Sequence, residues 1–234
     1  MDLSIRSILR ILSFVSNYYQ PLQIESSENK NKELFVVLTV PHAKCISTVE
    51  HSCDFLAEKA ANVLKSEFEK LGIKVHVEIG DLNRTFCDLN RYRCTKTGLR
   101  EVRKTGFRKR IRSVIRENRS DYRVVVFDVH SFPKRPGVWS ENYDVYTLFD
   151  NKVAEDFARH FINILNRSVF DTTDKISAIN IDGNNNDIMD EMLTIGIPCF
   201  LVEFNESLGK MERKLRFICE NFSSGLLSFD FSSL

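Results

Sequence analysis

The sequence predicts an α/β protein with a mainly parallel, twisted sheet and helices on both faces. Three segments rich in β-branched and aromatic residues show little polar alternation, as expected for strands buried on both faces: Leu34 to His42, Arg123 to Ser131 and Pro198 to Glu203. Segments with helical spacing of apolar residues separate them, and this alternation favours parallel pairing of the strands. The length of 234 residues favours one large domain over two.

Residues 1–32 are predicted to form an amphipathic helix and a polar linker. Apolar residues recur there at helical spacing, with arginines among them: Ile5, Ile8, Leu9, Leu12 and Val15. We expect this helix to pack on the domain, with docking to a membrane surface or to a partner as the alternative. Residues 33–234 are then predicted to form a single α/β domain.

Local patterns predict the elements of this domain in order. Pro41 ends the first strand, and a helix is predicted from Phe55 to Gly72, because glycine is typical of a helix C-terminus. Residues 73–79 alternate as a second strand. The same criteria predict the other elements: a basic helix between 98 and 118, a strand at 123–131, a helix at 151–166, a short strand near 175–181, a helix near 188–193, a strand at 198–203 and a last helix that starts near 207.

The charge and hydropathy of the chain argue against two classes of partner. The formal net charge is +1, so no long-range attraction to nucleic acid or membranes is expected. The basic helix lacks interleaved aromatic residues that could stack on bases, and we interpret it as a solvated surface. No run reaches the roughly 18 apolar residues that a membrane span needs.

The six cysteines are interpreted as reduced thiols. They show no CxxC spacing and are too sparse for a disulfide scaffold in a chain of this length. The uninterrupted apolar core and the cleavage site of a secretory signal are also lacking. We therefore expect a cytoplasmic protein.

Each of the three buried strands ends in a side chain that can do chemistry. His42 and His130 follow the first two runs, and Glu203 ends the third. If these strands are parallel, the three side chains meet at one rim of the sheet, where open α/β folds place their sites. Two histidines and a glutamate are typical of a zinc-assisted hydrolase, in which the carboxylate takes the proton of a water molecule.

Four motifs resemble, in order, those of the N-formylglutamate amidohydrolase family: VPHAKC, CDLNRYR, FDVHSFP and FLVEFNE. That family is related to the zinc carboxypeptidases and to aspartoacylase-type deacylases. The resemblance spans about residues 34–208 and implies a zinc-carboxypeptidase-like (phosphorylase/hydrolase-like) architecture. It also implies zinc-dependent hydrolysis of the amide bond of an N-acyl (N-formyl) amino acid or a similar small substrate with a carboxylate.

The resemblance assigns His42 and His130 as zinc ligands and Glu203 as the general base. Asp88 in DLNR resembles the carboxylate that orients a metal-binding histidine, which is a role with a clear physical basis. A turn-building role is the alternative for Asp88, because aspartate favours turns.

The substrate contacts that the resemblance implies come from three polar residues. Asn90 and Arg91 match the pair that grips a substrate carboxylate, and the planar guanidinium of arginine suits this task because it binds both oxygens. Arg84 is predicted to be a further catalytic contact, to a carboxylate or to the oxyanion.

The third zinc ligand departs from the carboxypeptidase pattern, which has a glutamate three residues after the first histidine. Cys45 occupies that position here, and a thiolate also binds zinc. We prefer Asp54, because it opens the helix after the first strand, although a carboxylate there could simply cap that helix. Glu50 and His51 are further candidates.

Two other functions are compatible with the same sequence. A zinc carboxypeptidase would act on peptide or protein C-termini, which also carry a free carboxylate. A non-enzymatic interaction protein would retain the scaffold without its chemistry.

Overall fold

The structure is a computed structural model that describes residues 32–45, 53–91, 93–96, 106–133, 142–149, 152–171, 176–182 and 187–231. The predicted N-terminal helix lies outside the described residues, and so do the candidate ligands Glu50 and His51.

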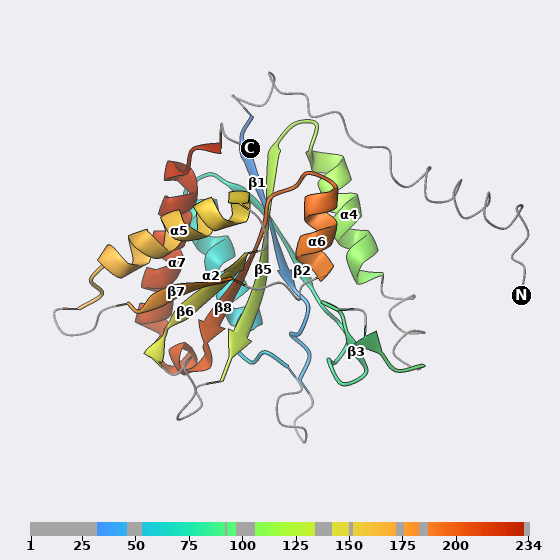
Figure 1. Ribbon diagram of the computed structural model, residues 1–234, viewed down its shortest axis with the longest axis horizontal. Helices are drawn as coiled ribbons and strands as arrows, with labels where there is room; N and C mark the ends of the chain where they lie inside the picture. Colours follow the sequence, from blue (N-terminus) through green and yellow to red (C-terminus); the bar gives the residue numbers. More distant parts are fainter. Residues whose placement is uncertain are drawn as a thin grey trace, which may run out of the picture.

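Six strands form the central sheet (Figure 1): β1 (Leu34–Val40), β2 (Lys74–Ile79), β5 (Arg123–Phe132), β6 (Val145–Phe149), β7 (Ala178–Asp182) and β8 (Cys199–Asn205). Their order in the sheet is β2-β1-β5-β8-β6-β7. The first four strands of this order are parallel, whereas β6 is antiparallel to β8, and β7 is parallel to β6. The prediction of a mainly parallel sheet is confirmed, with β6 and β7 reversed.

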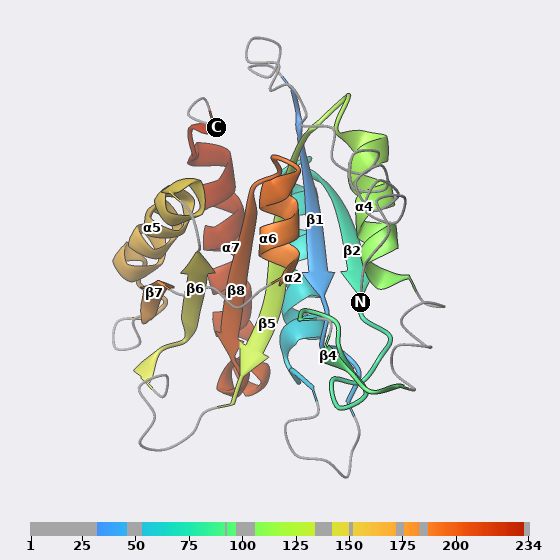
Figure 2. The ribbon, with the colours of Figure 1, turned by 45° about the vertical axis from the view of Figure 1, so that its right-hand side comes forward.

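Helices cover both faces of the sheet (Figure 2): α2 (Ala57–Lys70), α5 (Lys152–Arg167) and α7 (Glu212–Ser228) on one face, and α4 (Phe107–Asn118) and α6 (Asp187–Thr194) on the other. Alternate residues of a strand point to opposite faces, so Val125 and Phe127 enter the first core and Val126 the second. Among the described helices, none is long and apolar enough to cross a membrane.

Several short elements were not predicted from the sequence. A hairpin of β3 (Cys87–Asp88) and β4 (Arg93–Cys94) carries part of the DLNR motif, and the 3₁₀ helix η3 (Glu206–Lys210) precedes α7. The strand β6 was also missed, because its five residues VYTLF lie close to the Pro- and Gly-containing segment after His130 and form no long apolar run. Because η3 occupies residues 206–210, the last helix begins at Glu212 rather than near residue 207.

The sheet face that packs on α4 and α6 changes from apolar to polar along the strands. Val126 of β5 and Leu201 of β8 belong to the apolar core on this face. Two and four residues after Val126 come Asp128 and His130, and two residues after Leu201 comes Glu203. Since residues two apart share a face, the strand ends present polar groups above an apolar base.

Two disulfides overturn the prediction of reduced thiols. Cys45 is bonded to Cys53, and Cys87 is bonded to Cys94 across the β3–β4 hairpin. The partners are 8 and 7 residues apart, and each pair closes a short local loop. The absence of CxxC spacing did not exclude such pairs, because only the tertiary structure brings the sulfur atoms together. Cys199 and Cys219 are buried and form no disulfide.

Candidate metal centre

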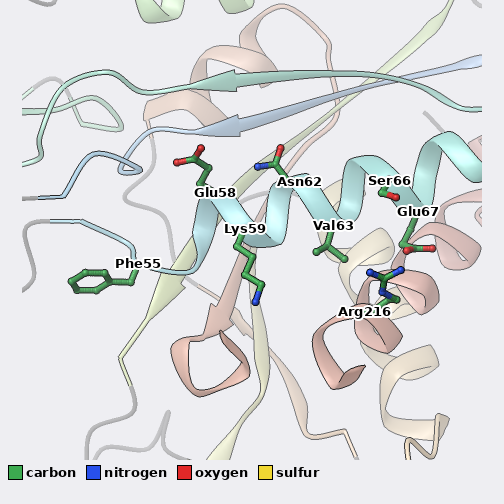
Figure 3. Close-up of a pocket in the computed structure, with 8 residues that line it drawn as sticks. All are labelled: Phe55, Glu58, Lys59, Asn62, Val63, Ser66, Glu67 and Arg216. Atoms are coloured by element: carbon green, nitrogen blue, oxygen red, sulfur yellow. The ribbon is translucent and has the colours of Figure 1, made fainter. Parts of the chain in front are cut away.

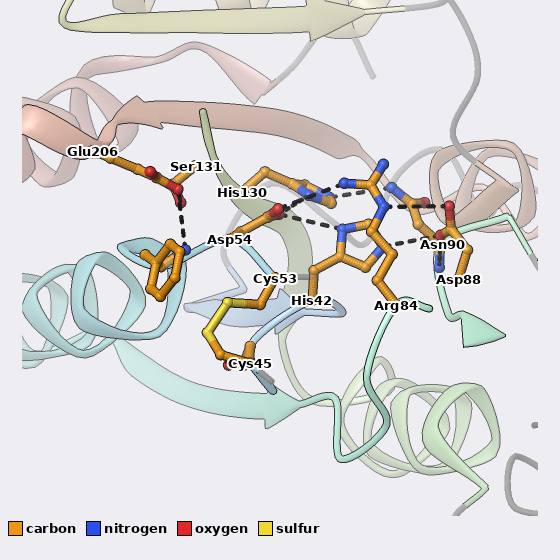
Figure 4. Close-up of polar contacts among 12 residues, drawn as sticks. His42, Cys45, Cys53, Asp54, Arg84, Asp88, Asn90, His130, Ser131 and Glu206 are labelled. Carbon is orange, nitrogen blue, oxygen red and sulfur yellow. Dashed lines mark hydrogen bonds and ion pairs between the residues drawn. A yellow bond between two sulfur atoms is a disulfide. The ribbon is translucent and has the colours of Figure 1, made fainter. Parts of the chain in front are cut away.

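Three buried side chains converge at the carboxyl ends of the central strands (Figure 4). His42 lies just after β1, His130 belongs to β5, and Asp54 lies shortly before α2. Each offers one ligand atom, and these atoms all lie within 4.8 Å of one another. Two imidazole nitrogens and one carboxylate oxygen are the three protein ligands of many catalytic zinc sites, which leave a fourth position open.

Asp54 is the residue that joins the two histidines. Its Oδ2 lies 3.3 Å from His42 Nδ1 and 2.7 Å from His130 Nδ1. Burial disfavours the charged carboxylate, but the hydrogen bonds and charges of the two histidines outweigh it and hold the pKa of Asp54 well below its usual range. The Cys45 sulfur is engaged with Cys53 and is not a thiolate ligand here, so that alternative is excluded for the disulfide-bonded protein.

Asp54 does not cap the helix that follows it. The Phe55 amide donates to Glu206 Oε1 at 3.2 Å, and the Leu56 amide donates to Ser131 Oγ at 3.1 Å. The Ser131 hydroxyl in turn donates to Glu206 Oε1 at 3.2 Å. Because these residues satisfy the free amides that precede α2, the Asp54 carboxylate is left to face the histidines.

The second nitrogen of each histidine ring also meets a carboxylate. His42 Nε2 lies 2.9 Å from Asp88 Oδ1, and His130 Nε2 lies 3.0 Å from Asp128 Oδ2. Thr39 Oγ1 donates to the other oxygen of Asp128 at 2.6 Å. A carboxylate at Nε2 fixes the tautomer and the orientation of a ring whose Nδ1 is to bind a metal.

Asp128 was missed by the sequence analysis, although a signal for it exists. It lies two residues before His130 on the same strand, so both side chains project from one face of the sheet. Burial opposes the charged form of His130, but Asp128 and then Asp54 raise its pKa well above the usual value. Both carboxylates therefore favour the protonated form of the ring.

Asp88 both orients His42 and builds its own turn. Its Oδ1 accepts hydrogen bonds from the amides of Asn90 at 3.0 Å and Arg91 at 3.1 Å. Burial would raise the pKa of Asp88, but the bond to His42 and the charges of His42 and Arg84 hold it well below its usual range. Asp88 can therefore orient the His42 ring and stabilise a turn at the same time.

Arg84 and Asn90 reach the centre, as Figure 4 shows. Arg84 Nη1 lies 3.7 Å from Asp54 Oδ1, and its Nε lies 3.8 Å from Asp88 Oδ2. Asn90 Nδ2 lies 3.2 Å from His130 Nε2. Among the described residues, Asn90 Oδ1 is the buried side-chain polar atom without a hydrogen-bond partner. For Arg91, the structure places the backbone beside Asp88.

Glu203 lies next to His130 across the β5–β8 pair. Burial raises its pKa to about 7; the charge of His130 opposes this rise and the charge of Asp54 adds to it. Tyr146 of β6 lies opposite Glu203 in the β6–β8 pair, within reach of a hydrogen bond to its carboxylate. A carboxyl group with a pKa near neutrality can both take up and return a proton.

A depression on the α2–α7 side of the molecule shares no residue with this centre (Figure 3). It is lined by Phe55, Glu58, Lys59, Asn62, Val63, Ser66, Glu67 and Arg216. Both signs of charge are present on its walls, so the depression shows no clear preference for one kind of ligand.

Several solved structures match this fold, whereas no family model and no curated protein match the sequence. A gene product of Agrobacterium tumefaciens is 15% identical, with a TM-score of 0.63 over 85% of this chain and 92% of that chain. A metallo-carboxypeptidase from Burkholderia cenocepacia is 12% identical, with a TM-score of 0.51 over 84% of this chain and 56% of that chain. The chain thus spans little more than half of the Burkholderia protein, and the likeness is one of fold.

Proposed function

We propose that this protein is a zinc-dependent amidohydrolase that cleaves N-acyl (N-formyl) amino acids or similar small substrates with a carboxylate. The observation that carries the proposal is the convergence of His42, Asp54 and His130, with Glu203 on the neighbouring strand. The resemblance of four sequence motifs to the N-formylglutamate amidohydrolase family supports the choice of substrate. The fold shared with a metallo-carboxypeptidase is compatible with it.

The donor set fits zinc. Nδ1 of both histidines and Oδ2 of Asp54 face one another, and both Nε2 atoms are held by carboxylates. When bound, zinc would polarise the substrate carbonyl and lower the pKa of a water molecule.

Glu203 is the proposed general base. With a pKa near 7, it takes the proton of the attacking water and passes it to the leaving nitrogen. Arg84 lies at the edge of the centre, with 37% of its side chain exposed, and can stabilise the negative charge that develops on the carbonyl oxygen. Asn90 and Arg91 are proposed to hold the substrate carboxylate.

The test begins with metal content and substrate range. Elemental analysis of the purified protein should find about one zinc per chain, and the zinc form should hydrolyse N-formyl amino acids. Glu203→Gln should retain zinc but lose about 10²- to 10⁴-fold in kcat. Absence of metal binding together with absence of hydrolysis would overturn the proposal, and an undiminished kcat in Glu203→Gln would remove that residue as the base.

Carboxypeptidase activity on peptide or protein C-termini is the second candidate, because the fold is shared with a metallo-carboxypeptidase. Parallel assays on N-formyl and N-acetyl amino acids and on dipeptides separate the two functions. Cytoplasmic localisation remains a prediction, and the two disulfides oppose it because such bonds are rare in reducing compartments.

A further inference from the structure

A row of three side chains crosses three neighbouring strands at the candidate centre. His130 of β5 pairs with Glu203 of β8, and Glu203 pairs with Tyr146 of β6. Residues directly opposite each other in neighbouring strands project from the same face of the sheet. Tyr146 therefore stands beside Glu203, on the side away from the metal ligand His130.

Two contacts hold the Tyr146 side chain in this place. The centroid of its ring lies 4.8 Å from the ring centroid of Phe132, and the angle between the two ring planes is 41°. Its hydroxyl lies within reach of a hydrogen bond to the carboxylate of Glu203, the residue opposite it in β8. Since Phe132 is itself buried at the end of β5, the phenol is held by its ring as well as by its hydroxyl.

The direction of this hydrogen bond follows from the chemistry of the phenol. Burial and the negative charge of Glu203 raise the pKa of Tyr146 above its usual value, so the hydroxyl keeps its proton and donates it. A carboxylate has two oxygens, so one can accept from Tyr146 while the other exchanges a proton with a water molecule or a leaving group.

We propose that Tyr146 is a positioning residue that holds the Glu203 carboxylate in its orientation for proton transfer. This inference rests on the proposed hydrolase function, in which Glu203 is the base. Tyr146 acts through Glu203 and is assigned no contact with the substrate.

The variant Tyr146→Phe removes the hydroxyl and keeps the ring that packs on Phe132. We expect kcat to fall about 10- to 100-fold, the range for loss of a hydrogen bond to a charged group, with KM and zinc content unchanged. Tyr122→Phe is the matched control. Tyr122 lies just before β5, at the opposite end of that strand from His130, and its hydroxyl accepts a hydrogen bond from Lys74. Its removal should leave kcat unchanged.

A double-mutant cycle separates this role from a general structural one. In the Glu203→Gln background, adding Tyr146→Phe should cause little further loss, because the group that it positions is already gone. An equal fold-loss in both backgrounds, or a wild-type kcat in Tyr146→Phe, would overturn the inference.

Infrared spectroscopy tests the same contact without turnover. The carboxylate band that disappears in Glu203→Gln identifies Glu203, and Tyr146→Phe should shift this band, whereas an unshifted band would overturn the inference. If Tyr146→Phe shifts the band but the zinc-loaded wild type hydrolyses no substrate, the contact is supported and the proposed hydrolase function is refuted.

Discussion

Replacing Asp128 by asparagine should weaken zinc binding, although Asp128 is not a proposed ligand. Its carboxylate accepts the Nε2 hydrogen of His130 at 3.0 Å and the hydroxyl of Thr39 at 2.6 Å. Asparagine has nearly the same shape but no charge. The imidazole would then lose its anionic partner, and its Nδ1 would become a weaker donor to the metal.

The expected loss of zinc affinity is about 10- to 100-fold, equivalent to about 1.4–2.7 kcal/mol. The upper half of this range is expected because Asp128 is 0% exposed, so water screens its charge little.

Competition of the metal-free protein with a chromophoric chelator measures the zinc dissociation constant, and near-UV circular dichroism reports whether the packing is retained. Asp121→Asn is the matched control, because Asp121 is an exposed carboxylate just before the same strand. A dissociation constant within about twofold of wild type in a normally packed Asp128→Asn would refute the role that we assign to this residue.

Three further predictions follow from the geometry around the centre. In Gly80→Ala, the new Cβ would lie 2.3 Å from the Pro41 carbonyl oxygen, so we expect the free energy of unfolding to drop by about 1–3 kcal/mol in denaturant titrations, with weaker zinc binding; wild-type values would contradict the tight packing. The double variant Cys45→Ser/Cys53→Ser should bind zinc more weakly, because the segment between His42 and Asp54 loses its cross-link, whereas an unchanged affinity would show that other contacts suffice. The kcat/KM of the zinc form should fall as the pH is lowered through the pKa of Glu203, which is raised to about 7, because protonation removes the base; zinc should move this limb to lower pH, and a profile flat from pH 4 to 8 would argue against Glu203.

Sequence patterns located the framework of this site well. β1 covers Leu34–Val40 and β5 covers Arg123–Phe132, close to the predicted bounds, because long runs of β-branched residues are the strongest strand signal. Parallel pairing then brought His42 and His130 to one rim, as expected. The preference for Asp54 agrees with the geometry, although its role in binding metal is still a proposal.

Other parts of the site could not be predicted from the sequence. Tyr146 lies on a five-residue strand whose reversed direction depends on how β6 pairs with β8. The disulfides depend on the folding of two local loops, and no short motif marks them. Glu206 accepts a hydrogen bond from the Phe55 amide, just before α2, although the two residues are 151 positions apart in the chain.

The sequence by itself determined the α/β class, the buried strands and the kinds of side chain at their ends, because periodicity and composition are local properties of the chain. Only the tertiary structure decided which of these side chains meet. The grouping of His42, Asp54 and His130, the carboxylates behind both rings and the place of Tyr146 beside Glu203 arise from strand order and register. These depend on packing between residues far apart in the chain, which a local pattern does not encode.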